Sequence, residues 1–307
     1  MIKRILSVIL IFSTLIALSA CGEIVNGDKI NIVCTTYATY DWTREIVGDN
    51  VDKFELTLLG DGVDLHSFQP TTADIAKIHT ADLFIQIGGT TEDWTQNLNL
   101  GDKALRLFDL LGDTEKLCIK DPHMQLKFSE DNYDEHIWLS LKRAERMVTA
   151  ISERICNLDT ANGVKYQKNC VDYIEALREL DQKYYSVMLD SKDKTVIFAD
   201  RYPFAYMMFD YGINCISAFD SCSSDADASF DTIAHLAEAV KKYDKDTVLV
   251  LENSAESVAE PLKSALTDRE INTAVMNSCQ TISTAESTSY IDIMTQNLKS
   301  FKAALRG

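Results

Sequence analysis

The sequence lacks the marks of several function classes. It contains no GxGxxG or Walker motif, and it shows no internal repeat. Its formal net charge of −17 repels nucleic acid and argues against a phosphate-polymer partner. No Ser-His-Asp triad, catalytic Cys-His pair or glycosidase-type pair of carboxylates stands out. We therefore expect a binding protein rather than an enzyme.

The apolar run at the start of the chain is too short to span a membrane. The apolar run over residues 5–18 follows Lys3 and Arg4 and ends in the residues LSAC at 18–21. A bilayer span needs about 20 apolar residues, whereas a basic start, a short apolar run and small residues are typical of a secretory signal. The ending resembles the lipobox of bacterial lipoproteins, which implies lipid attachment at Cys21. We expect a signal peptide over 1–20, a flexible tether over 21–28 and a domain anchored outside the cytoplasm.

Seven cysteines follow Cys21, an odd number that an exported chain cannot pair completely. Either the environment is anaerobic, or at least one thiol is free or bound to metal. Four of the seven lie within apolar strand-like or helix-like patterns, which favours a role as small buried hydrophobes; they are Cys34, Cys156, Cys170 and Cys215.

The hydrophobic content of 46% is ample for a folded core. Strand-like and helix-like segments alternate in two regions of the chain, which predicts an α/β fold with two lobes, each with a mainly parallel sheet flanked by helices. The predicted strands are 30–34, 54–59 and 83–87, then 195–199, 213–218, 247–251 and 271–276. The predicted helices are 41–47 and 71–80, then 203–211, 230–243, 255–266 and 286–305.

The middle of the chain has a different pattern. Residues 139–191 contain no proline and one glycine, Gly163. Apolar residues step by three and four from Leu141 to Ile155, and again at Val171, Ile174, Leu177, Leu180 and Tyr184. We predict one long helix over 164–189. The expected organisation is an N-terminal lobe over 29–140, a helical connector over 141–192 and a C-terminal lobe over 193–307.

Candidate metal ligands lie in loops that follow strands, where open α/β sheets bind ligands. Of the five histidines, His66 and His136 lie in such loops, whereas His79, His123 and His235 are expected in helices or a polar loop away from the site. Four further groups follow strands of the second lobe: Asp200, Cys222, Glu252 and Cys279. A set of imidazole, carboxylate and thiolate suits zinc. Alternatively, Cys222 and Cys279 form a disulfide.

Several stretches of the sequence resemble those of a known family. The chain resembles the metal-specific solute-binding lipoproteins of zinc and manganese ABC importers, the ZnuA/TroA-like family. The resemblance rests on IVCTTYATYDW, DLHSFQPTTADIAKIHTADLFIQIGG, DEHIWLSLKRA, FADRYPFAYMMFDYGI, VLVLENSAESVAEPL and SYIDIMTQNLKSFKAAL. It implies two lobes joined by one long rigid helix, a metal in the cleft between them, and delivery of that metal to an importer made of a permease and an ATPase. We expect a monomer.

The resemblance also implies a ligand set. The family motifs DPHSYEPT and DPHIWLDP fall on His66 and His136. The third family position falls on Arg201, which cannot ligate because it stays protonated, so Asp200 is the nearest candidate. The fourth position falls near Cys279. We expect Glu252 beside the metal rather than on it, and Arg201 paired with Asp200 or Glu252.

Some alternatives remain open from the sequence. Zinc is the favoured metal, but two histidines with two carboxylates would favour Mn²⁺ or Fe²⁺. The loop over 129–135 is acidic and has no histidine, unlike the His-rich insertion of many zinc members. A surface-anchored zinc-dependent hydrolase is the second hypothesis, and an adhesin or structural lipoprotein that needs no metal is the third.

Overall fold

The computed structural model describes residues 29–119, 126–127, 133–219, 228–254 and 256–306. The expected signal peptide and tether, with Cys21, lie outside these ranges, as do His123 and Cys222. Among the described helices, none is both long enough and apolar enough to cross a bilayer.

The N-terminal lobe is built on a parallel sheet of order β2-β1-β3-β4. Its strands are β1 (Ile30–Cys34), β2 (Phe54–Leu58), β3 (Leu83–Gln86) and β4 (Ala104–Arg106). Helix α2 (Tyr37–Val47) packs on the face that carries Ile32 and Cys34, and α3 (Thr72–Thr80) packs on the opposite face with Val33. This alternation is the strand period of two. The sequence missed β4, whose three residues are only partly buried.

The C-terminal lobe repeats this plan with a parallel sheet of order β10-β9-β7-β8. Its strands are β7 (Thr195–Phe198), β8 (Asn214–Ser217), β9 (Thr247–Leu251) and β10 (Asn272–Met276), and its helices are α6 (Ala205–Tyr211), α7 (Phe230–Lys242), α8 (Ala259–Ala265) and α9 (Tyr290–Leu305). The prediction placed the start of the last helix at 286, which was wrong. It begins at Tyr290 because the Ser289 side chain accepts the N–H of Asp292 and caps it.

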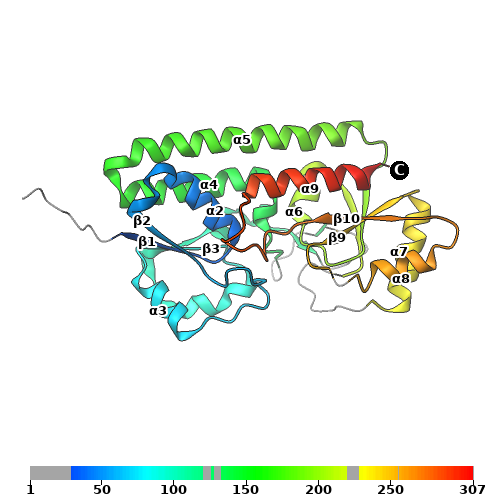
Figure 1. The fold of residues 1–307 in the computed structure, drawn as a ribbon, viewed down its shortest axis with the longest axis horizontal. Helices are drawn as coiled ribbons and strands as arrows, with labels where there is room; N and C mark the ends of the chain where they lie inside the picture. The colour runs from blue at the N-terminus through cyan, green and yellow to red at the C-terminus, as the bar shows by residue number, and fades with distance from the viewer. Residues whose placement is uncertain (1–28, 120–125, 128–132, 220–227, 255, 307) are drawn as a thin grey trace, which may run out of the picture.

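Two helices follow the N-terminal sheet: α4 (Leu141–Leu158), which packs against α2 of the N-terminal lobe, and α5 (Gly163–Asp190), which joins the two lobes. Helix α5 is 28 residues long and runs along both lobes, with α9 beside it over the C-terminal lobe (Figure 1). Its Tyr184 hydroxyl donates to the Met294 carbonyl of α9 at 2.7 Å. One detail of the prediction was wrong: Val171 is 62% exposed, because the neighbouring Cys170 occupies the buried stripe instead.

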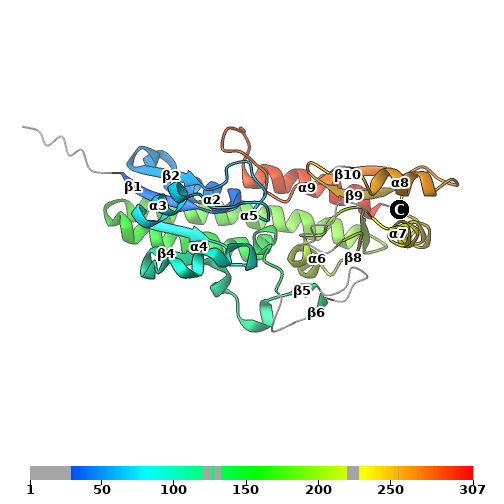
Figure 2. The same ribbon diagram turned by 90° about the horizontal axis from the view of Figure 1, so that it is seen from below.

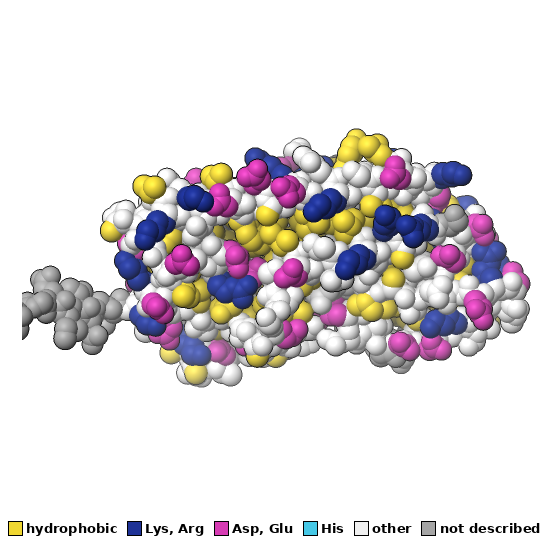
Figure 3. Space-filling model, turned by 45° about the horizontal axis from the view of Figure 1, so that its top comes forward, with side chains coloured by type: hydrophobic (Ala, Val, Ile, Leu, Met, Phe, Trp, Pro, Cys, Tyr) yellow, Lys and Arg dark blue, Asp and Glu magenta, His cyan; other side chains and the backbone are white. Residues whose placement is uncertain are grey.

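Smaller elements complete the described chain. A short antiparallel pair, β5 (Cys118–Ile119) and β6 (Leu126–Lys127), lies to one side of the sheets (Figure 2). Seven short 3-10 segments are described: Gly48–Lys53, Thr90–Leu98, Gly101–Lys103, Leu107–Leu110, Asp113–Glu115, Ile137–Leu139 and Thr160–Asn162. On the face shown in Figure 3, acidic and basic side chains are interspersed rather than gathered by sign, and an apolar strip crosses its middle.

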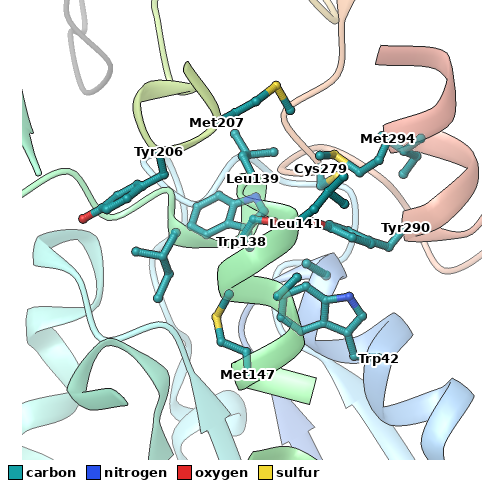
Figure 4. Packing of buried hydrophobic residues seen from close by; sticks show 14 of the residues in the cluster. Trp42, Trp138, Leu139, Leu141, Met147, Tyr206, Met207, Cys279, Tyr290 and Met294 are labelled. Atoms are coloured by element: carbon teal, nitrogen blue, oxygen red, sulfur yellow. Dashed lines mark hydrogen bonds between the residues drawn. The ribbon is translucent and has the colours of Figure 1, made fainter. Parts of the chain in front are cut away.

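The two lobes meet in one continuous apolar cluster. The Trp138 indole N–H donates to the Ser278 carbonyl at 2.8 Å, and the Tyr290 hydroxyl donates to the Trp138 carbonyl at 2.6 Å. Trp138, Tyr290 and Cys279 lie together in this cluster (Figure 4). These contacts tie the segment after His136 to the segment after β10, so both loops are held at the boundary between the lobes.

Candidate metal centre

His66 is presented by the loop that follows β2. The chain turns at Gly60, whose φ of +60° favours glycine, and a Cβ there would meet the Phe68 ring at 2.5 Å. The Asp64 carboxylate then accepts the N–H of His66 at 2.9 Å. Such a turn fixes the backbone direction of the histidine. The His66 side chain is 16% exposed, so it lies at the rim of the site.

His136 lies deeper, before the first turn that leads into α4. The Asp134 Oδ1 atom accepts both the backbone N–H of His136 at 2.9 Å and its Nδ1–H at 3.1 Å. The Tyr206 hydroxyl of α6 donates to the Asp134 carbonyl at 2.8 Å, so the C-terminal lobe supports this loop. The His136 side chain is fully buried.

The structure brings the two histidines together although 70 residues separate them. Their Nε2 atoms are 3.2 Å apart. Two nitrogens bound to one tetrahedral zinc at about 2.05 Å each are about 3.3 Å apart. The pair therefore has the separation that a shared zinc ion requires, before any metal is present.

Burial and neighbouring charges shift the pKa values of the two imidazoles in opposite directions. Burial, and then the neighbouring His136, lower the pKa of His66 to about 4. Burial also disfavours charge on His136, but the carboxylates of Asp134, Glu135 and Asp64 together outweigh it, and the pKa of His136 is raised. A neutral His66 beside a readily protonated His136 accounts for the short contact between the two Nε2 atoms, because one can donate to the other.

Two carboxylates that the sequence analysis did not single out lie behind the histidines. Asp134 contacts His136, and the Glu135 Oε1 atom lies 3.6 Å from Nδ1 of His66. The sequence held a signal for both, since they precede His136 directly in DEH. Burial raises the pKa of Glu135, and it raises the pKa of Glu92, which lies close to Glu135 in the same wall, to about 7.

The C-terminal lobe contributes polar groups that already have partners. Asp200 follows β7, and its two carboxylate oxygens accept the N–H of Arg201 at 2.7 Å and of Leu251 at 3.3 Å. Arg201 was predicted to pair with Asp200 or Glu252. Its guanidinium instead lies 3.5 Å from the Asp64 carboxylate. The reason is that the Asp64 loop of the N-terminal lobe faces Arg201 across the boundary.

Glu252, which follows β9, is held in the same way. Both of its carboxylate oxygens accept hydrogen bonds from Ser278, from the backbone N–H at 2.8 Å and from the hydroxyl. Burial raises its pKa, and the nearby Asp64 adds to this effect. The oxygens of Glu252 are therefore occupied by the loop that follows β10.

Cys279 does not join the histidines. Its side chain is fully buried among Trp138, Tyr290 and Met294 (Figure 4), and burial raises the pKa of its thiol well above the ordinary value. Metal ligation by Cys279 would require this thiol to leave the apolar cluster. It is a free thiol here, and Cys222 lies outside the described residues. Within the described ranges, no three His, Cys, Asp or Glu side chains are arranged to hold a metal.

Comparison with known proteins identifies the family of this chain. The family model described as "Zinc-uptake complex component A periplasmic" matches residues 32–304. The zinc-binding protein AdcA of Streptococcus pyogenes serotype M1 is 27% identical over 98% of the chain, which spans 61% of the length of AdcA. The high-affinity zinc uptake system protein ZnuA of Bacillus subtilis is 29% identical over 99% of both chains.

A solved structure gives the same picture at the level of the fold. The Zn(II)-bound ZnuA-like domain of Streptococcus pneumoniae AdcA is 26% identical, with a TM-score of 0.71 over 91% of this chain and 100% of that domain. The family match covers almost the whole described chain, and it includes both loops that carry the facing histidines. The chain therefore belongs to the ZnuA family of periplasmic zinc-uptake components.

Proposed function

We propose that this protein captures zinc outside the cytoplasm and delivers it to an ABC importer. The observation that carries the proposal is the 3.2 Å separation of the His66 and His136 Nε2 atoms, which matches two nitrogens on one zinc. The names of the relatives support zinc as the ion. His66 and His136 are the proposed ligands of the N-terminal lobe.

Asp200 is the proposed ligand of the C-terminal lobe. Both of its oxygens accept backbone N–H groups in this structure, so ligation requires a small rearrangement of the segment after β7. Each carboxylate oxygen can accept more than one contact, and a closing motion of two lobes is an established way to complete a site. Cys279 is left out of this set because its thiol is fully buried in the apolar cluster.

The experiment is zinc binding by the reduced, metal-free chain, measured by competition with a chromogenic chelator. We expect one zinc per chain, lost in both His66→Ala and His136→Ala. The matched control is His79→Ala, which removes an exposed imidazole on α3. Binding that survives both site substitutions, or that falls equally in the control, would overturn the proposal.

We further propose that the chain is not a hydrolase. In a zinc hydrolase the general base beside the metal-bound water would be Glu252, and both of its oxygens already accept hydrogen bonds from Ser278. The zinc-loaded chain should not turn over ester or phosphoester substrates. Turnover that disappears in Glu252→Gln would favour the hydrolase instead.

A further inference from the structure

Glu135 has one unused oxygen that faces a proposed ligand. Its side chain is 1% exposed. Its Oε2 atom accepts the N–H of Thr91 at 3.0 Å, whereas Oε1 has no hydrogen-bond partner among the described residues and lies 3.6 Å from Nδ1 of His66. A buried carboxylate oxygen without a partner costs free energy of folding. Its position beside an imidazole therefore indicates a role.

The end of β3 is shaped around this carboxylate. A Cβ at Gly89 would lie 2.0 Å from Oε2 of Glu135 and 2.2 Å from its Cβ, and neither distance is sterically possible. Glycine at this position therefore leaves the space that the Glu135 side chain fills. Thr91, two residues later, supplies the N–H that fixes one oxygen and so directs the other toward His66.

The neighbouring residue already provides the same arrangement for the other histidine. Asp134 accepts the Nδ1–H of His136 at 3.1 Å, which holds the Nε2 atom of His136 facing that of His66. A carboxylate on the second ring nitrogen fixes the tautomer, the ring orientation and the basicity of a metal-binding histidine. The consecutive residues Asp134 and Glu135 thus lie behind the two imidazoles, one each.

We propose that Glu135 is a positioning residue that holds the His66 imidazole with Nδ1–H toward its own Oε1 and with Nε2 free for the metal. The proposal rests on the zinc-binding function proposed above. The His66 Nδ1 and Glu135 Oε1 atoms are 3.6 Å apart without metal, only slightly beyond hydrogen-bond distance.

The test reads the tautomer of His66 directly. Long-range ¹H–¹⁵N spectra of the metal-free chain with labelled histidine report which ring nitrogen carries the proton, and the His66 signals are assigned by their absence in His66→Gln. We expect the Nδ1–H tautomer in the wild type and a shift toward Nε2–H in Glu135→Leu. Zinc affinity should fall about 10- to 100-fold in that variant.

Two further variants keep the test decisive. Glu135→Gln retains the size and one acceptor oxygen, and it should lie between wild type and Glu135→Leu in both readouts. Glu92→Gln removes another buried carboxylate of the same wall, which accepts the N–H of Gly88 instead of facing His66, and should leave the tautomer unchanged.

Two outcomes would overturn the proposal: an Nε2–H tautomer in the wild type, or a tautomer that does not respond to loss of Glu135. Because the spectra are recorded without metal, they test the positioning role even if the wild type were found not to bind zinc. That separate result would instead contradict the proposed function.

Discussion

The two lobes present unlike edges to the candidate metal centre. On the N-terminal lobe, two imidazoles point their Nε2 atoms at each other, and a carboxylate lies behind each ring. On the C-terminal lobe, the carboxylates of Asp200 and Glu252 already accept hydrogen bonds from the loops around them. We infer from this difference that the N-terminal edge is prepared for an ion, whereas the C-terminal edge would have to exchange existing contacts to bind it.

The largest effect expected from this comparison is the loss of one prepared ligand. His136→Ala should weaken zinc binding by roughly 3 kcal/mol or more, which is more than a hundredfold, since structural zinc binds with about 10–16 kcal/mol shared over about four ligands. Asp200→Ala, on the C-terminal edge, should cost less. Competition titrations on both variants check this, and an equal or reversed order would break the comparison.

The buried carboxyl of Glu92, in the wall behind the histidines, should reduce the free energy of unfolding at neutral pH. Glu92 is buried and its pKa is raised from 4.5 to about 7, so the folded state binds this proton more tightly than the unfolded state does. The contribution of Glu92 to the free energy of unfolding is therefore complete below about pH 4.5. It is lost as the pH rises toward 7, by about 3 kcal/mol at most.

Glu92→Gln removes this dependence. The variant should gain stability over the wild type progressively between about pH 4.5 and 7, as measured by urea unfolding of the metal-free chain. A stability difference that stays constant across this range would show that the Glu92 carboxyl titrates normally.

A substitution at Arg201 can add an imidazole to the C-terminal lobe and so make the two lobes more alike. The family resemblance implies a ligand at its position, and its guanidinium lies 3.5 Å from Asp64 across the lobe boundary. Arg201→His removes a positive charge beside the site and adds an imidazole, so zinc should bind about tenfold more tightly, or about 1.4 kcal/mol. Arg201→Gln is the control, because it removes the charge without adding a strong ligand. Weaker binding in Arg201→His would mean that the link to Asp64 is needed.

The smallest effect on zinc is expected at Cys279. Its thiol packs in the apolar cluster between the lobes, so Cys279→Ala should lower the free energy of unfolding by about 1 kcal/mol and leave zinc affinity unchanged within about twofold. Thermal unfolding and zinc titration on the same sample separate the two roles. A large loss of zinc with little loss of stability would return Cys279 to the ligand set.

The sequence by itself determined the architecture and pointed to two histidines as proposed ligands. Periodicity alone predicted the long helix that is observed as α5, and the alternation of strands and helices predicted two parallel sheets. Both are local patterns, because burial on one face of an element repeats along the chain. His66 and His136 stood out because each lies in a loop that the family resemblance makes specific.

Only the tertiary structure decided which groups meet around those histidines. The contact between His66 and Glu135, the link between Arg201 and Asp64, and the burial of Cys279 join segments far apart in the chain. These contacts depend on how loops turn at the ends of strands and on what fills the boundary between the lobes. No local pattern encodes them, since a carboxylate, a guanidinium or a thiol after a strand can turn to the site, to the other lobe or into the core.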